Sequence, residues 1–196
     1  MKKQTNNSLR TIIAITFLTM LLTITACNER KEPTQNPAVS ETRVKPLKVD
    51  IHTAVMTGNM EALKQHIAAG SNLNEKDPLG GSSPLISASL FGKTAMAKTL
   101  IDAGADLNFQ NNDGSTALIT ASFFCRPQIV KMLLDKNADK TIKNKYGSTA
   151  YESVAGPFAD VKASYEGLGK MLEPMGLKLD HTYLEKTRPE IAAMLK

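Results

Sequence analysis

The strongest constraint on the fold is a pattern of about 33 residues that returns along the chain. Residues 88–108, ASLFGKTAMAKTLIDAGADLN, align with residues 121–141, ASFFCRPQIVKMLLDKNADKT, at an offset of 33. Residues 54–74 fit the same frame at an offset of 34, and the residues from Tyr146 match those from Asp113 at 33. A repeat of this length predicts a solenoid, because one short helical unit can bury its apolar face only against the next unit.

Each copy predicts a short helix, a turn and a longer helix. The longer helix carries an apolar stripe at helical spacing, formed by Ala97, Leu100 and Ile101 in one copy and by Val130, Leu133 and Leu134 in the next. Gly104 is expected to end its helix in the left-handed conformation, and Asn137 takes the matching place in the next copy. His66 stands where other copies have Leu, which suits an outer repeat with a wetter face.

These copies resemble the ankyrin repeat family. The family's T-P-L-H-x-A motif is similar to residues 83–88, SPLISA, and 116–121, TALITA, and its G-A-D-x-N ending matches residues 104–108. The resemblance covers about residues 48–156 and the last turns of the chain. It implies an all-α fold, an ankyrin-repeat solenoid of helix-turn-helix units with hairpin loops and an extended C-terminal helical cap. The expected repeats are about 49–79, 80–112, 113–146 and 147–196, within a domain of residues 49–196.

The fourth repeat departs from the pattern. Residues 188–195, RPEIAAML, align with 126–133, RPQIVKML, at an offset of 62, so about 29 residues are inserted. Within the insert an apolar stripe at helical spacing predicts a helix at about 157–173, ended by Pro174 and Gly176. The stripe is formed by Phe158, Val161, Tyr165, Leu168 and Leu172. Residues 187–190, TRPE, predict a capping box that opens the last helix. The insert is either an elaborate cap on the solenoid or part of a binding surface.

The N-terminal residues have the form of a targeting segment. Ten residues with three basic side chains precede a 16-residue apolar stretch, 11–26, that contains five threonines and is short for a membrane span. The stretch ends in Ile24-Thr25-Ala26-Cys27, which resembles a bacterial lipobox and implies lipidation of Cys27 after removal of residues 1–26. Ordinary signal cleavage and an uncleaved anchor are the alternatives. Residues 27–48 are polar with three prolines and are expected to be a flexible tether.

This arrangement predicts a protein of the bacterial cell envelope, lipid-anchored and facing the periplasm. Asn28 rather than Asp after the cysteine favours the outer membrane, by analogy with lipoprotein sorting. The formal net charge of +5 includes three basic residues among the first ten, and without residues 1–27 it falls to +2, from 21 basic and 19 acidic residues. So small a charge gives no basic stripe for phosphate contacts, and we expect no nucleic-acid partner.

The motifs that could carry chemistry are incomplete. Gly92-Lys93-Thr94 lacks the first glycine of a phosphate loop, and residues 106–114 lack the glycine of a calcium loop. By the family resemblance, His52 is expected to hydrogen-bond neighbouring backbone, and Cys125 takes the glycine position of its helix turn. We expect no catalytic residue, no metal site, no cofactor and no small-molecule substrate. The alternative is an enzyme or small-ligand protein that uses the insert, with Asp180 and His181 as candidates.

The expected function is protein binding. In the ankyrin family the concave face usually holds the partner, and the variable residues before each helix turn belong to it. Here these residues are apolar, and they are the candidate partner-binding residues: Met56, Leu90, Phe91, Phe123 and Phe124. Stacked on successive repeats they would form an exposed stripe with aromatic anchors; one residue of each pair could instead pack inward. A non-catalytic inhibitor, immunity factor or protective scaffold would fit, and a purely structural envelope protein is a further alternative.

Overall fold

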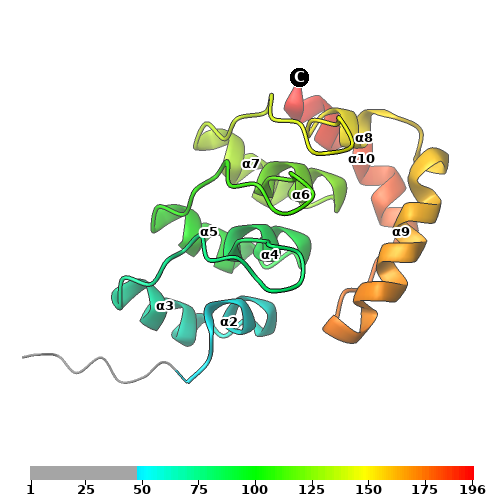
Figure 1. The fold of residues 1–196 in the computed structure, drawn as a ribbon. Helices are drawn as coiled ribbons and strands as arrows, with labels where there is room; N and C mark the ends of the chain where they lie inside the picture. Colours follow the sequence, from blue (N-terminus) through cyan, green and yellow to red (C-terminus); the bar gives the residue numbers. More distant parts are fainter. Residues whose placement is uncertain (1–47) are drawn as a thin grey trace, which may run out of the picture. The chain divides into compact units, whose positions relative to one another are not determined.

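The computed structural model describes residues 48–196, and every helix in that range pairs with a neighbour (Figure 1). The first three repeats are the helix pairs α2 and α3 (Ile51–Thr57, Met60–Ala68), α4 and α5 (Pro84–Leu90, Thr94–Asp102), and α6 and α7 (Ala117–Phe123, Pro127–Asp135). They are followed by α8 (Glu152–Ala155), α9 (Phe158–Leu172), the 3-10 turn η1 (Glu173–Met175) and α10 (His181–Leu195). The predicted all-α solenoid is confirmed. The proposed signal segment, Cys27 and nearly all of the tether lie outside the described residues.

The short helices form one layer and the longer helices another. In Figure 1 α2, α4, α6 and α8 are stacked in order, with α3, α5 and α7 beside them and the hairpin loops in front. Helix α10 takes the place of a long helix in the fourth repeat, where it packs against α7 and α8. Helix α9 leaves this frame and runs down at the right of the stack in Figure 1, where it packs against α10 and against Phe123 at the end of α6.

Local signals at the helix ends explain the repeated shape. Ser83 and Thr116 are the N-caps of α4 and α6, and their hydroxyls accept hydrogen bonds from the backbone N–H groups three residues on. The turn between the two helices of a repeat needs a left-handed residue, and Gly92 has φ +64° there. In the third repeat Cys125 adopts φ +51° at the same place, and Asn137 adopts φ +59° as predicted.

Neighbouring hairpin loops are joined by backbone hydrogen bonds. Asn112 N donates to Gly80 O at 3.0 Å, and Lys145 N donates to Asp113 O at 2.8 Å. Each loop is closed by a side-chain acceptor, which is Asp77 in the first loop. Burial alone would raise the pKa of the Asp77 carboxyl group. Hydrogen bonds from three backbone N–H groups stabilise its charged form and hold the pKa below its ordinary value.

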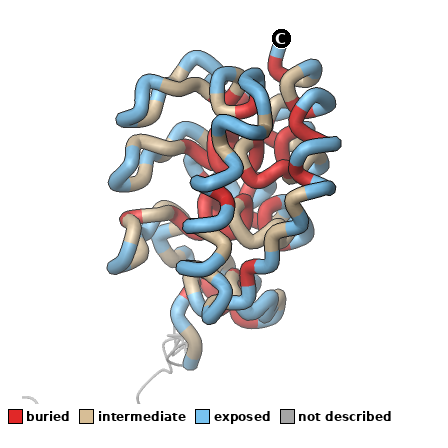
Figure 2. The backbone as a smooth tube through the Cα atoms, turned by 90° about the vertical axis from the view of Figure 1, so that its right-hand side faces the viewer, coloured by how far each residue is buried: buried red, intermediate tan, exposed pale blue. Residues whose placement is uncertain are grey.

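The apolar core runs through the stack, as Figure 2 shows by the buried residues along its interior. One cluster extends from Ile51 in the first helix to Leu195 in the last. A second, smaller cluster joins Cys125, Tyr165 and Leu184, and so links the third repeat to α9 and α10. The described residues, 48–196, therefore form one continuous core and a separate contact that holds the insert.

The extra helix predicted at about 157–173 is α9, and Gly176 with φ +86° follows it. The predicted start of the last helix is wrong. Helix α10 begins at His181 with Asp180 as its N-cap, whose carboxylate accepts from Tyr183 N at 3.1 Å, and Pro189 lies inside the helix. A capping box forms instead at Thr149 and Glu152, where it opens α8.

The two histidines of the first repeat both differ from expectation. His66 is only 7% exposed, and its ring nitrogens lie 3.0 Å from Ser71 Oγ and 2.8 Å from Val49 O. The expectation of a wet site there is wrong, because backbone and hydroxyl groups of the first repeat satisfy the ring. Within the part of the chain that the structure describes, neither buried ring nitrogen of His52 has a hydrogen-bond partner, so its predicted backbone hydrogen bond is also absent.

Candidate partner-binding surface

The five predicted binding residues lie at the ends of the short helices. Leu90 and Phe123 are the last residues of α4 and α6, Phe91 and Phe124 follow them, and Met56 is in the last turn of α2. Since the short helices are stacked, these positions form a row along the solenoid (Figure 1). The row is in place, but its parts differ in how far they are covered.

In the third repeat the protein covers the row with its own insert. The rings of Phe123 and Tyr165 are stacked with centroids 4.5 Å apart, and Phe158 stacks on Tyr165 at 5.7 Å. Phe124 meets Phe123 edge-on and is only 6% exposed. The expectation of an open stripe through Phe123 and Phe124 is therefore wrong, because the apolar stripe of α9 needs an apolar surface and uses this one.

Hydrogen bonds fix α9 at this position. The Tyr165 hydroxyl donates to Phe123 O, and Arg188 Nη1 lies 3.0 Å from the same hydroxyl. Arg188 is 2% exposed and also donates to Ser153 O and Gly156 O. These carbonyls lie at the end of α8, where the helix itself supplies no further N–H donors. Tyr183 donates to Cys125 O at 3.3 Å. Sequence reasoning missed this group, although aromatic residues inside a helical stripe were its signal.

Burial sets the protonation of the two acidic groups in this cluster. It raises the pKa of the Tyr165 hydroxyl to about 12, despite the nearby Arg188 guanidinium. It raises the pKa of the Cys125 thiol to about 11. Both groups are therefore protonated at neutral pH, and a protonated thiol is a poor nucleophile and metal ligand. The cluster is a structural contact rather than a reactive one.

In the first two repeats the row is the open part, since none of its residues there packs against the apolar cluster that holds the insert. Met56, Leu90 and Phe91 are half-buried, as Phe123 is, and they belong to neither of the two apolar clusters of residues 48–196. Two cations accompany them, and each lies over the glycine of the preceding turn. Lys93 Nζ is 4.0 Å from where a Cβ on Gly58 would stand, and Arg126 Nε is 2.9 Å from the corresponding point on Gly92. We call Met56, Leu90, Phe91, Lys93 and Arg126 the turn row.

The cations of the turn row lack acidic partners among residues 48–196, whose ion pairs are formed by Lys98, Lys131 and Lys143. Arg126 instead donates to Leu90 O at 3.2 Å. Burial lowers the pKa of its guanidinium, which still leaves it charged at neutral pH because arginine starts above 12. The open part of the row thus combines apolar side chains with two unneutralised positive charges.

The hairpin tips present a different surface. Leu79 is 81% exposed and Tyr146 is 77% exposed. The three lysines of the last tip are partly engaged, since Lys143 pairs with Glu152 at 3.5 Å and Lys140 donates to the carbonyls of Leu195 and Lys196. Leu79 and Tyr146 were not among the predicted binding residues. The signal that could have indicated them is a single large apolar or aromatic side chain at the tip of a polar loop.

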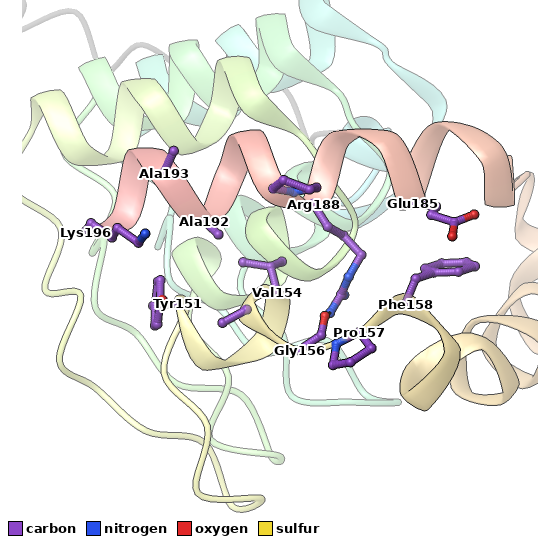
Figure 3. A pocket seen from close by; sticks show the side chains of 12 residues that line it. Tyr151, Val154, Gly156, Pro157, Phe158, Glu185, Arg188, Ala192, Ala193 and Lys196 are labelled. Carbon is purple, nitrogen blue, oxygen red and sulfur yellow. The ribbon is translucent and has the colours of Figure 1, made fainter.

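A shallow cleft of about 390 Å³ lies between α8, the start of α9 and α10 (Figure 3). Arg188 crosses it toward Gly156, and Glu185 and Phe158 lie near one end. The candidates of the enzyme alternative do not form a catalytic pair there, since Asp180 caps α10 and the ring of His181 lies against Phe158 at 6.1 Å. Across residues 48–196 no three acidic, histidine or cysteine side chains are grouped to hold a metal ion.

Comparison with known families decides the class of the repeats. The family model described as "Ankyrin repeats (3 copies)" matches residues 51–144. These residues are ankyrin repeats. Among solved structures, the ankyrin repeat domain of Bcl-3, a member of the IkappaB protein family, aligns with a TM-score of 0.51 and 31% identity. The alignment covers 53% of this chain and 45% of the Bcl-3 chain.

Two curated relatives are also similar in their ankyrin repeats. Human DNA-binding protein RFXANK is 38% identical over 58 residues, which are 30% of this chain and 22% of that protein. Human protein phosphatase 1 regulatory subunit 27 is 36% identical over 64 residues, 33% of this chain and 41% of that protein. The chain thus spans less than half the length of these relatives. The likeness supports binding or regulatory roles for ankyrin repeats and assigns no specific partner.

Helices α8, α9 and α10 and the turn η1 all lie beyond the matched residues 51–144. None of the helices between residues 48 and 196 has the length and apolar character to cross a bilayer.

Proposed function

We propose that the protein is a non-catalytic binding module whose ankyrin repeats hold a protein partner at the bacterial cell envelope. The observation that carries this proposal is the open part of the turn row. Leu90 and Phe91 are half-buried apolar side chains outside both apolar clusters, at positions where ankyrin repeats contact their partners. An apolar surface with an aromatic anchor beside charged groups is typical of a protein interface.

The proposed location rests on the sequence of residues 1–27. A lipidated Cys27 would hold the protein on the periplasmic side of a membrane, with the outer membrane favoured by Asn28, and residues 28–48 would let the repeats reach a partner nearby. Several acyl chains, at about 0.8 kcal/mol per buried methylene, suffice for stable attachment. The partner could be inhibited, neutralised or protected by this capture.

The anchor is tested with Cys27→Ser, because a serine at this position lacks the thiol that lipid transfer requires. Growth with a radiolabelled fatty acid should label the wild-type chain in the membrane fraction. The variant should lose the label and leave that fraction or remain unprocessed. A labelled variant that stays in the membrane would contradict the proposed lipid site.

Partner binding is tested by site-specific photocrosslinking with the full chain in the bacterium. A photoreactive residue is placed at Met56, Leu90 or Phe91, and the matched control replaces Lys131, which is exposed on the outer helix α7. The three row positions should crosslink to one shared protein that the control does not reach. Crosslinks only from Lys131, or none from any position, would contradict the proposed function. The activity of the captured protein, with and without this chain, then separates an inhibitor from a scaffold.

A further inference from the structure

We propose that the partner segment seated on the turn row is an amphipathic helix that carries an aromatic residue on its apolar face and acidic residues beside it. This inference rests on the proposed function and deepens it, since it names the chemistry of the partner at the same surface. It follows from the way in which the chain occupies the equivalent position of its own third repeat.

The third repeat shows what such a position binds. Residues 123–126, FFCR, are the counterparts of residues 90–93, LFGK, at the offset of 33. On the former lies the amphipathic helix α9, whose Tyr165 stacks on Phe123 and donates a hydrogen bond to Phe123 O. Helix α9 thus supplies an aromatic ring for the apolar side chain and a donor for a carbonyl at the end of the short helix.

The second repeat offers the counterpart residues on a turn of similar backbone, with more positive charge. Leu90 and Phe91 take the places of Phe123 and Phe124, and unlike Phe123 neither of them is packed against the cluster that holds the insert. Lys93 and Arg126 flank them without acidic partners in residues 48–196. Carboxylates beside the apolar face of a bound helix would neutralise both cations, and partly desolvated ion pairs of this kind contribute to partner selection.

The probe is a synthetic peptide derived from the chain's own helix. It comprises residues 157–173 with Gly167→Ala and Gly169→Ala, which strengthen the helix, and Lys162→Glu and Lys170→Glu, which supply acidic residues. The fluorescently labelled peptide is titrated against the full chain in detergent micelles, with fluorescence anisotropy as the readout. A second peptide that also carries Phe158→Ala and Tyr165→Ala tests the aromatic requirement.

We expect saturable binding that weakens with added salt and is at least tenfold weaker for the peptide without aromatic residues. The double variant Phe91→Asp/Lys93→Glu should weaken binding at least tenfold. The exposed control variants Tyr146→Ala at the hairpin tip and Lys131→Glu on α7 should leave it unchanged. Circular dichroism of each variant establishes that it is folded.

Absence of saturable binding would overturn the inference, as would full binding by the folded double variant, which would place the peptide elsewhere. Loss of binding in Tyr146→Ala alone would assign the peptide to the hairpin tips and also overturn it. These outcomes are separable from failure of the proposed function. If crosslinking from Leu90 still captures a partner while the peptide does not bind, the proposed function stands. The inference that the partner segment is an acidic amphipathic helix is then wrong.

Discussion

At the residue scale, the turn between the two helices of a repeat shows how a backbone requirement and a side-chain contact meet. Gly92 has φ +64°, and a Cβ there would stand 2.9 Å from Arg126 Nε, a guanidinium held by Leu90 O. The sequence predicts the glycine from its place in the repeat. It does not predict the close approach of Arg126, because that contact depends on how two repeats are stacked.

We therefore expect Gly92→Ala to destabilise the protein more than Gly104→Ala. Both residues have positive φ, so each substitution should cost about 1 kcal/mol from the left-handed backbone alone. At Gly104 no atom lies within 4 Å of an added Cβ, whereas at Gly92 Arg126 must shift, which should add roughly 1–3 kcal/mol. Chemical denaturation of the two variants measures the difference. Equal losses of stability would show that Arg126 moves aside freely.

At the scale of elements, helix α9 was predictable, whereas its contact with the repeats and the start of α10 were not. The stripe through Phe158, Val161 and Tyr165 correctly predicted α9, since helical spacing is a local property. Its target on Phe123 is a contact between residues 42 positions apart, confirmed by the hydrogen bond from Tyr165. The start of α10 was misplaced because Thr187 and Glu190 have the pattern of a capping box. The actual N-cap is Asp180, and the residues that follow it, 181–187, are less apolar than the last residues of the helix.

Helix α9 is weakened by a glycine that no contact requires. Gly167 is exposed, and an added Cβ would meet no atom within 4 Å. We expect Gly167→Ala to stabilise α9 by about 0.5–1 kcal/mol, because alanine loses less backbone entropy in a helix. Slower hydrogen exchange of the α9 amides would report it. Gly176→Ala is the control, and it should destabilise the protein because Gly176 has φ +86°. Faster exchange of the α9 amides in the Gly167 variant would contradict the expectation.

At the scale of the whole molecule, the two apolar clusters predict two levels of cooperativity. The repeats share one core from Ile51 to Leu195, as expected of stacked units that depend on their neighbours. Helix α9 and the start of α10 are held by the cluster around Cys125, Tyr165 and Leu184. The repeat period made the first core predictable from sequence. The second cluster has no counterpart in the repeat, so the period could not reveal it, nor that it covers part of the predicted binding row.

Leu184→Ala and Leu118→Ala should separate these levels. Both side chains are 1% exposed, so each truncation should cost about 2–5 kcal/mol. Leu184→Ala removes a member of the second cluster, and we expect faster hydrogen exchange in α9 and faster alkylation of Cys125, with α2 to α5 nearly unchanged. Leu118→Ala lies in the shared core and should raise exchange throughout the repeats. If Leu184→Ala raised exchange equally in α2 to α5, the insert would be part of the solenoid's own cooperative unit, and the open turn row of the first two repeats would depend on it.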